Sequence, residues 1–511
     1  MPLVHLFLGF LFFQAPRPAS VAGVVTNSAT GAPVRKAHLT FQSTDRTYNT
    51  TTDASGRFSI GEVAPGSYNA RAESEGYQVA GQPLKLAEDQ HLDDLAFHLT
   101  PSGVITGRVL DENGEPLAQI YVEAQLETWG RDGRQKSNAG AVTTDDRGEY
   151  RFFNLWAGRY YIVASNPQLG SGMNGRVHTD PVEMAYVTTW FPNTTDASQA
   201  APNMLAPGAE LSGIDIRMRR ERVFHIRGRA LLPPGQRAPV DVMSCDAAGS
   251  RGVSTPILRD GSFDASGVQP GAWCLLINLM PDATHGFTAR QAVNVADHDV
   301  NNVSLTVSPT SEIHGQILVD GAPPTKLPRM PIRLDPVEAR GRGAASGAEA
   351  DGAFVLQNVA AGAYRLMDLN LFGMYLKTIR FNDRDVPDGI LQVPAGGGRM
   401  TLAFATDPGE ISGSAKGAFY VTASSSVLWN DVPATSPVNA DGNFLLRGLP
   451  PGDYQVTAWE TRDFGPLQYG EMRKLFDSRA ASVTVHPKGR ESVQLNVVPA
   501  ADIEAALARL R

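Results

Sequence analysis

A pair of glycines ten residues apart occurs five times along this chain, each time inside the same pattern of aromatic and apolar residues. An aromatic residue follows the first glycine by two positions, and another aromatic residue follows the second glycine by two positions. The pairs are Gly56 and Gly66, Gly148 and Gly158, Gly261 and Gly271, Gly352 and Gly362, and Gly442 and Gly452. Fivefold recurrence of one motif predicts tandem copies of a single small structural unit.

Each position of the motif has a mechanical interpretation. The first glycine follows an Asp, Ser or Arg, so we expect it to close a tight hairpin turn with positive φ. The aromatic residue and the apolar residue two positions later point to one face, which is the period of a half-buried strand. We expect the second glycine to let the chain return in an antiparallel strand.

A strand of the form apolar-x-Gly-x opens every copy, and an alternating strand closes it. The opening glycines are Gly23, Gly107, Gly228, Gly315 and Gly413, and the closing strands lie at 95–99, 214–218, 303–307, 400–404 and 493–497. Their spacing suits one small sandwich per copy. Two short helical patterns, at 471–477 and 502–511, are the exceptions, and Asp502 is the expected cap of the second.

The predicted fold is therefore all-β, with five tandem small antiparallel β-sandwich domains of prealbumin-like or Ig-like type and short helices near the C-terminus. The predicted domains are a signal peptide at 1–20, sandwiches at 21–101, 102–220, 221–309, 310–406 and 407–499, and a short helix at 500–511. The second sandwich carries an aromatic insert.

The first residues predict export. Residues 3–13 form an apolar run followed by small residues and prolines, as in a secretory signal peptide, and the alternative is a first strand that simply packs. No later stretch reaches the 18 to 20 apolar residues that a transmembrane helix needs. A secreted, periplasmic or cell-surface location follows, in which disulfides persist.

The two cysteines, Cys245 and Cys274, lie in the third copy. Both fall on the outward parity of their strands, which is compatible with a cross-strand disulfide, and two free thiols are the alternative.

The opening Gly strand, the D-x-x-G-x-[FY] turn and the L-x-P-G-x-Y segment together resemble the carboxypeptidase regulatory-like domain. Asp53 to Tyr68 and Asp145 to Tyr160 match that motif most fully, whereas the last three copies have Asp and Gly adjacent. The resemblance implies a prealbumin-like sandwich similar to starch-binding-like and collagen-adhesin folds. The insert at 186–192 looks like a segment common in secreted bacterial repeat proteins. The family name confers no peptidase activity, because the domain is an appendage of a peptidase.

Several kinds of chemistry find no support in the sequence. A net charge of −8 leaves no basic surplus, so we expect no nucleic-acid partner. Neither an H-E-x-x-H zinc motif nor a G-x-S-x-G elbow occurs. Residues 170–175 fit the G-x-G-x-x-G pattern, but no helix follows, as a phosphate-binding loop would require. Asp297-His298-Asp299 is interpreted as a solvated turn rather than a metal site. The turn aspartates are interpreted as Asx turns rather than calcium ligands. We predict no catalytic residues, no metal and no cofactor.

Aromatic residues of the second copy are the best functional lead. Trp156, Tyr186, Trp190 and Phe191 are candidate ligand-binding residues, since exposed rings stack on sugar faces or anchor protein partners. Packing within or between sandwiches is the alternative.

The sequence thus predicts an exported, non-catalytic binding or structural protein of the bacterial cell envelope, with a glycan or an envelope protein as its partner. A carbohydrate-binding array associated with polysaccharide degradation is the alternative, and an enzyme is a third, weaker hypothesis because short sandwiches offer no evident carboxylate pair. The oligomeric state is left open.

Overall fold

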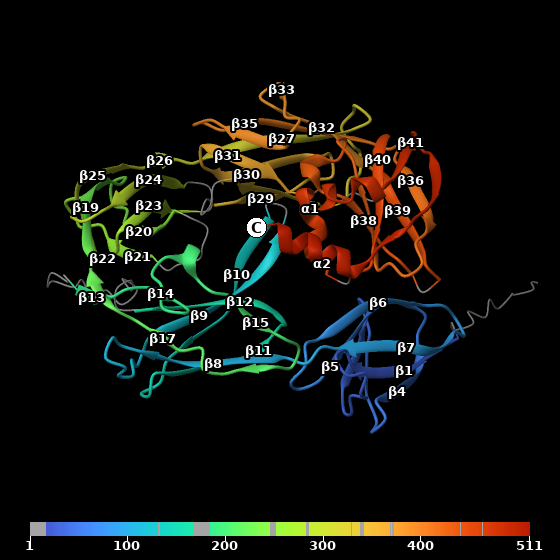
Figure 1. Cartoon of the computed structure of the whole chain (residues 1–511). Helices are drawn as coiled ribbons and strands as arrows, with labels where there is room; N and C mark the ends of the chain where they lie inside the picture. The colour runs from blue at the N-terminus through green and yellow to red at the C-terminus, as the bar shows by residue number, and fades with distance from the viewer. Residues whose placement is uncertain are drawn as a thin grey trace, which may run out of the picture. The chain divides into compact units, whose positions relative to one another are not determined.

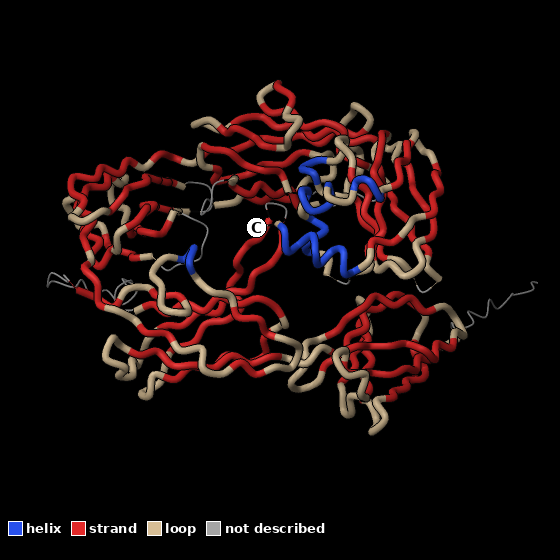
Figure 2. Tube along the Cα trace, in the orientation of Figure 1, coloured by secondary structure: helices blue, strands red, loops and turns tan. Residues whose placement is uncertain are grey.

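The computed structural model describes residues 17–510 apart from 131–132, 167–183, 246–251, 283–285, 329, 338–341, 368, 370–372, 440 and 462. Strands dominate these residues, and helices are confined mainly to the C-terminal part (Figures 1 and 2). The chain divides into two compact units. Unit 1 comprises Met1–Leu126, Ala139–Ala164 and Thr189–Met218, and unit 2 comprises Glu127–Asn138, Ser165–Thr188 and Arg219–Arg511.

One sheet of each repeat places the opening strand in the middle. The motif strand pairs antiparallel with it on one side, and the closing strand pairs parallel with it on the other. In repeat order these strands are β1 (Ala19–Asn27), β4 (Arg57–Val63) and β7 (His91–Leu99); β8 (Gly103–Leu110), β11 (Glu149–Leu155), β16 (Glu210–Leu211) and β17 (Ile216–Arg217); β19 (Phe224–Leu231), β22 (Ser262–Val268) and β25 (Val300–Thr306); β27 (Ser311–Val319), β30 (Ala353–Val359) and β35 (Gly398–Ala405); and β36 (Gly409–Ser414), β39 (Asn443–Leu449) and β42 (Arg490–Gln494).

The second sheet of each repeat is antiparallel along its main path. Its strands, in spatial order, are β3 (Thr47–Thr51), β2 (His38–Gln42), β5 (Gly66–Glu73) and β6 (Ala80–Leu86); β10 (Gly133–Thr143), β9 (Tyr121–Gly130), β12 (Gly158–Ser165) and β14 (Thr189–Trp190), with β15 (Asn203–Leu205) also on β12; β21 (Val253–Pro256), β20 (Pro239–Ser244), β23 (Gly271–Leu279), β24 (Phe287–Val295) and β26 (Ser308–Pro309); β29 (Ala344–Gly347), β28 (Pro331–Pro336), β31 (Gly362–Leu366) and β34 (Ile390–Val393); and β38 (Ala434–Pro437), β37 (Tyr420–Ser424), β40 (Gly452–Trp459) and β41 (Ala481–Val485). Repeat 4 adds β32 (Tyr375–Phe381) and β33 (Arg384–Asp385) to its first sheet, and β43 (Val497–Val498) pairs with β40. The predicted five tandem sandwiches are confirmed, whereas the boundaries drawn between them stay predictions.

The prediction of a hairpin at the first glycine was wrong. In repeat 1 the turn at Gly56 leads from β3 in one sheet to β4 in the other, and the turn at Gly66 leads back from β4 to β5. Both glycines therefore serve crossings between sheets. The first glycine of every pair nevertheless has φ between 70° and 84°, as expected, and the second has φ between 143° and 159°.

The opening-strand glycine and the motif aromatic residue form one packing device. Gly23 lies opposite Phe58, and the same cross-strand pair recurs in all five repeats. A Cβ at Gly23 would collide with the Phe58 ring and with the carbonyl of Leu95 on the parallel neighbour. The five motif rings are each at most 5% exposed. The opening glycine is therefore required because the motif ring and, in four of the repeats, a carbonyl of the closing segment occupy the space that a Cβ would need.

A bulge before the end of each motif strand is a second shared feature. The register shifts there in all five repeats. A residue of positive φ stands at the bulge, namely Glu62, Asn154, Gly267, Asn358 and Gly448. Asn and Gly dominate because they adopt this conformation at low cost.

A helical subdomain completes unit 2. It consists of η5 (Gly465–Gln468), α1 (Gly470–Lys474), η6 (Asp477–Arg479) and α2 (Ala500–Arg509), so both predicted helical segments are confirmed. These helices share a buried cluster with Trp459 of β40. The prediction that Asp502 caps α2 was wrong: Pro499 is the N-cap, and Asp502 lies in the first turn, where it pairs with Arg479 at 2.6 Å.

Residues 127–138 pack on this helical subdomain, although they are distant in sequence. Arg134 donates from Nη2 to the carbonyls of Leu507 and Leu510, each at 3.0 Å, in the last turn of α2. Its Nη1 pairs with Glu127 at 3.0 Å, and its guanidinium lies 4.9 Å from the centre of the Trp129 ring. We call this arrangement of Glu127, Trp129, Arg134 and the end of α2 the Arg134 clasp. It satisfies carbonyls that a helix leaves unpaired at its C-terminus.

The predicted leader overlaps the fold. Residues 1–16 lie outside the described residues, and β1 begins at Ala19, which is buried and opposite Val63. The last two residues of the predicted signal peptide therefore belong to the first strand. None of the helices in the described part of the chain is long and apolar enough to cross a membrane.

Candidate functional site

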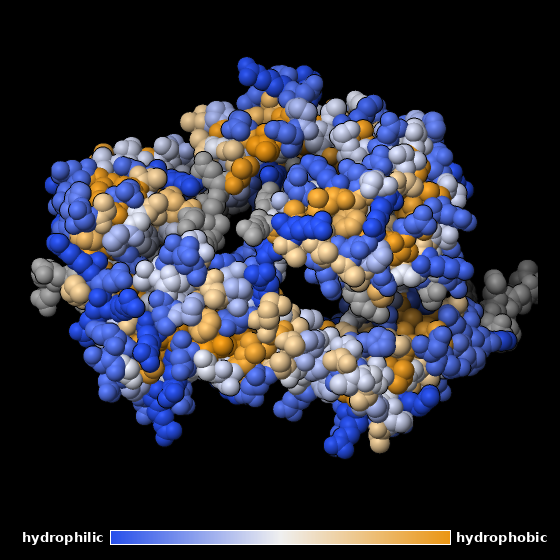
Figure 3. Space-filling view, viewed as in Figure 1, coloured by the Kyte–Doolittle hydropathy of each residue, from blue (hydrophilic) through white to orange (hydrophobic). Residues whose placement is uncertain are grey.

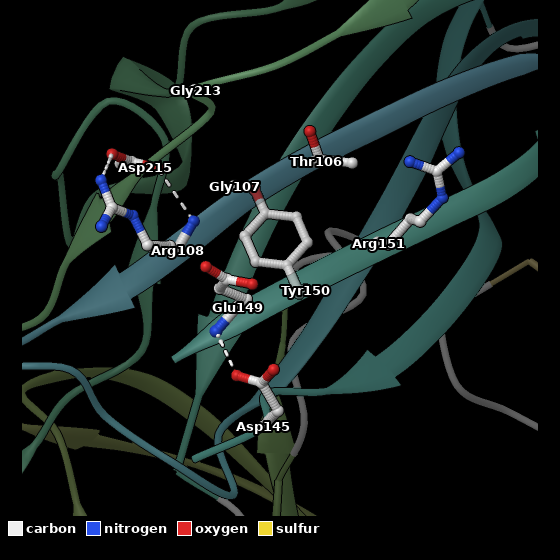
Figure 4. A pocket seen from close by; sticks show the side chains of 9 residues that line it. All are labelled: Thr106, Gly107, Arg108, Asp145, Glu149, Tyr150, Arg151, Gly213 and Asp215. Atoms are coloured by element: carbon white, nitrogen blue, oxygen red, sulfur yellow. Dashed lines mark hydrogen bonds and ion pairs between the residues drawn. The ribbon is translucent and has the colours of Figure 1, made fainter. Parts of the chain in front are cut away.

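The second repeat contains a polar cavity of about 500 Å³, which is shown in Figure 4. It lies where the closing strand is split: β16 and β17 each pair with β8, and the segment between them carries Gly213 with φ of 75°. The closing strands of the other four repeats run through as single strands. The cavity is lined by Thr106, Gly107, Arg108, Asp145, Glu149, Tyr150, Arg151, Gly213 and Asp215.

Tyr150 is the only tyrosine among the five motif aromatics, and its hydroxyl contacts the segment between the two short closing strands. The hydroxyl donates to the carbonyl of Ile214 at 2.5 Å, in the segment between β16 and β17. Burial, and to a lesser degree the charge of Asp215, raises the pKa of Tyr150 far above its ordinary value. A neutral phenol committed to a carbonyl cannot act as a base, so Tyr150 has a structural role here.

Three charged side chains of the cavity lining, Arg108, Asp215 and Arg151, have ion-pair partners. Asp215 accepts from the backbone N–H of Arg108 at 2.9 Å and lies 3.9 Å from its guanidinium. Arg151 pairs with Glu210 at 2.9 Å. In Figure 4 the side chains of Arg108 and Arg151 lie on either side of the Tyr150 ring. The Arg108, Asp215 and Arg151 side chains of the lining are therefore already engaged in ion pairs.

The turn aspartates act as expected for Asx turns. Asp53 accepts backbone N–H bonds from Ser55 and Arg57, and Asp145 accepts them from Arg147 and Glu149. Hydrogen bonds from Ser55, followed by that from Arg57, lower the pKa of Asp53. In the fifth repeat Asn439 takes this role instead of Asp441. Among the described residues no three His, Cys, Asp or Glu side chains gather in a way that could hold a metal ion.

The four predicted aromatic residues have different surroundings. Trp156 is 52% exposed in the connection from β11 to β12. Trp190 is 2% exposed, because β14 pairs with β12 and turns the ring into the core, so this residue has no ring face to offer a ligand. Phe191 is half-buried, and Tyr186 is half-buried in unit 2 on β13 (Met184–Tyr186).

Sequence reasoning missed Phe153, which is 71% exposed and lies on the outer face of β11 three positions before Trp156. The alternation that buries Phe152 already placed it outward. On the face shown in Figure 3, apolar side chains form scattered small groups on a mostly hydrophilic surface. Phe153 and Trp156 are the strongest aromatic candidates for a ligand surface in unit 1.

Cys245 and Cys274 are joined by a disulfide, with Cα atoms 5.0 Å apart. Cys274 alternates along β23 with Leu275 and Ile277, which belong to the core cluster of the repeat, and it is itself buried. The exposed side chains of Asp297 and His298 share a hydrogen bond of 2.7 Å, in agreement with a solvated turn. Residues 170–175 lie outside the described residues.

Comparison with known proteins supports the expected family for the first two repeats. The model of the carboxypeptidase regulatory-like domain matches residues 20–100 and 104–187, so that resemblance is confirmed there. A search of curated proteins gave no match.

Several solved structures are weakly similar. They include the TIE protein of Bacillus anthracis (11% identity, 57% of this chain and 51% of that chain, TM-score 0.18) and a minor pilin of Streptococcus agalactiae (12%, 40% and 96%, 0.22). A third contains two B repeat units of the collagen-binding protein of Staphylococcus aureus (10%, 76% and 100%, 0.14). The chain spans about half the length of the first of these. At such identities and TM-scores the likeness does not extend to function.

Proposed function

We propose that this chain, whose first two repeats are carboxypeptidase regulatory-like domains, is an exported, non-catalytic binding or structural protein of the bacterial cell envelope. The observation that carries the proposal is the contrast inside the second repeat. Arg108, Tyr150, Arg151 and Asp215 of its cavity already have hydrogen-bond or ion-pair partners, whereas Phe153 and Trp156 stand exposed on its surface. Binding by exposed rings needs no reactive group.

The disulfide supports export. Cys245 and Cys274 are the only cysteines of the chain, and the structure joins them. Disulfides persist outside the cytoplasm, where thiols are not kept reduced.

Fractionation of cells that produce the full chain tests this proposal. We expect the protein outside the cytoplasm, with both cysteines resistant to alkylation until a reductant is added. A cytoplasmic protein with two alkylatable thiols would contradict export.

Carbohydrate binding is the second candidate, and the exposure of both Trp156 and Phe153 favours it. Flat rings at low ordering cost stack on the apolar faces of sugars. A panel of neutral glycans screened against the full chain tests it, with Trp156→Ala expected to abolish any binding found. Leu231→Ala, which removes another exposed apolar side chain, in the third repeat, is the matched control. Equal loss in both variants, or no bound glycan, would contradict a sugar site at Trp156.

A further inference from the structure

A short two-stranded ribbon in unit 2 presents an unusual set of side chains. β13 (Met184–Tyr186) pairs antiparallel with β18 (Arg220–Arg222), with Met184 opposite Arg222 and Tyr186 opposite Arg220. Directly opposed residues of an antiparallel pair share one face, so these four side chains lie on the same face. Ala185, between them, is buried with Val187 and Val223 on the other face. We call the residues 184–186 and 220–222 the arginine ribbon (Figure 1).

Both arginines of the ribbon lie over aromatic rings. The guanidinium of Arg220 is 4.8 Å from the centre of the Tyr186 ring, and that of Arg222 is 5.3 Å from the centre of the Phe224 ring. A stacked guanidinium uses its flat face, so its in-plane N–H donors remain available for another group. Stacking also restricts the side chain before any ligand arrives, which lowers the entropy lost on binding.

Neither arginine has a carboxylate partner in the part of the chain that the structure describes. Other arginines of the protein do: Arg227 pairs with Asp264 and Asp299, and Arg333 pairs with Asp335. Arg219, Arg220 and Arg222 are all exposed. They stand together in a chain whose net charge is −8, so this concentration of unpaired positive charge runs against the composition.

The nearby acidic residue Asp297 makes no ion pair with the ribbon among the residues that the structure describes. Asp297 is paired with His298 at 2.7 Å, and that hydrogen bond, with a smaller contribution from the charge of Arg222, lowers the pKa of Asp297. The field of Arg222 therefore reaches Asp297 without an ion pair between them.

We propose that the arginine ribbon binds a carboxylate-bearing polysaccharide. This inference rests on the proposed binding function and gives it a chemical class and a second surface. Planar guanidinium groups match carboxylates with two parallel hydrogen bonds, and Tyr186 and Met184 supply apolar area for a sugar ring. Two arginines at alternate positions of one strand, about 7 Å apart, suit a linear polymer that repeats its charge.

The observations favour this occupant over nucleic acid. Duplex binders that make about 6–10 phosphate contacts rely on as many basic groups, whereas the ribbon has two arginines, preceded by Arg219, on an acidic protein. A short, solvent-exposed strand pair can make several weak contacts along a flexible polymer, whereas a small compact ligand would need a deep pocket.

Binding of the full chain to sodium polygalacturonate tests the proposal, with neutral dextran and duplex DNA as comparison ligands. We expect binding of polygalacturonate that weakens as salt rises, and no binding of dextran at this surface. The double variant Arg220→Gln/Arg222→Gln should weaken polygalacturonate binding at least tenfold. Arg220→Lys/Arg222→Lys should weaken it less, since it retains charge without the planar fork.

The matched control is Arg333→Gln/Arg447→Gln, which removes the same total charge from two ion-paired arginines. Far-UV circular dichroism should be unchanged in both double variants. Equal weakening by the two doubles, tighter binding of DNA than of polygalacturonate, or no binding by the wild type would each overturn the proposal. Trp156→Ala should leave polygalacturonate binding intact, so failure at the ribbon and failure of the Trp156 site are distinguishable.

Discussion

Arg134→Ala should release the last turn of α2. The substitution removes two hydrogen bonds from a charged donor to the carbonyls of Leu507 and Leu510 and the ion pair with Glu127, whose side chain is only 8% exposed. Hydrogen bonds of charged groups contribute about 1.5–3 kcal/mol each, and these share one side chain, so they do not add fully. Arg134 Nε is buried with no hydrogen-bond partner among the described residues. The free-energy cost of burying this donor disappears in Arg134→Ala and reduces the net loss of stability. We expect a net local loss of about 3 kcal/mol.

Hydrogen exchange at the amides of α2 is the suitable assay, because a chain of several sandwiches does not unfold in one step. A loss of about 3 kcal/mol corresponds to roughly 100-fold faster exchange. Arg479→Ala is the matched control. It breaks the ion pair between Arg479 and Asp502 of α2, whose side chains are 48% and 43% exposed. Exposed pairs contribute about 0–1 kcal/mol, so exchange should rise no more than about fivefold. Unchanged exchange in Arg134→Ala, or a larger effect of Arg479→Ala, would refute the reasoning.

Three other substitutions or treatments follow from the same structure. Gly23→Ala should destabilise the first repeat by about 3 kcal/mol or more, since its Cβ meets a ring and a carbonyl, whereas Gly61→Ala, with open space around it, should change denaturant midpoints little. Tyr150→Phe removes the hydroxyl bond to the split closing strand and should cost about 1 kcal/mol, measured as faster hydrogen exchange at residues 211–216; no change there would show that the hydroxyl does not hold the segment. Reduction of Cys245–Cys274, which closes a loop of 29 residues, should destabilise the third repeat by about 3–4 kcal/mol, measured by proteolysis with and without reductant, and equal rates would contradict this.

The sequence correctly predicted which side chains of a strand face the core. It did not predict which strand each strand pairs with. Period-two alternation identified the buried motif aromatics, and positive φ at the first glycines followed from their turns. Alternation cannot tell whether the next strand pairs with the last or crosses to the other sheet. The hairpin at Gly56 was wrong for that reason, and the requirement for Gly23 was invisible until its register with Phe58 was known.

The aromatic candidates show the same limit at the site. Trp190 was chosen because its ring is large. Whether that ring is exposed depends on the pairing of its strand, and pairing with β12 leaves it buried. Phe153 could have been found, because Phe152 fixed the inward parity of β11. The stacked Arg220 and Arg222 could not have been, since the pairing of β18 with β13 joins segments more than thirty residues apart.

The residues at the positions shared by all five repeats are needed for folding. The opening glycine, the motif ring, the bulge and the second glycine are each required by packing or backbone conformation, so none is free to specify a ligand. Specific recognition must therefore reside where a repeat departs from the pattern. Trp156 and the arginine ribbon both do so: Trp156 is the only tryptophan between a motif strand and its second glycine, and the ribbon pairs 184–186, an insertion before β14, with 220–222, the segment that precedes β19. In a protein built from copies, the residues that the copies do not share are the first place to look for its partners.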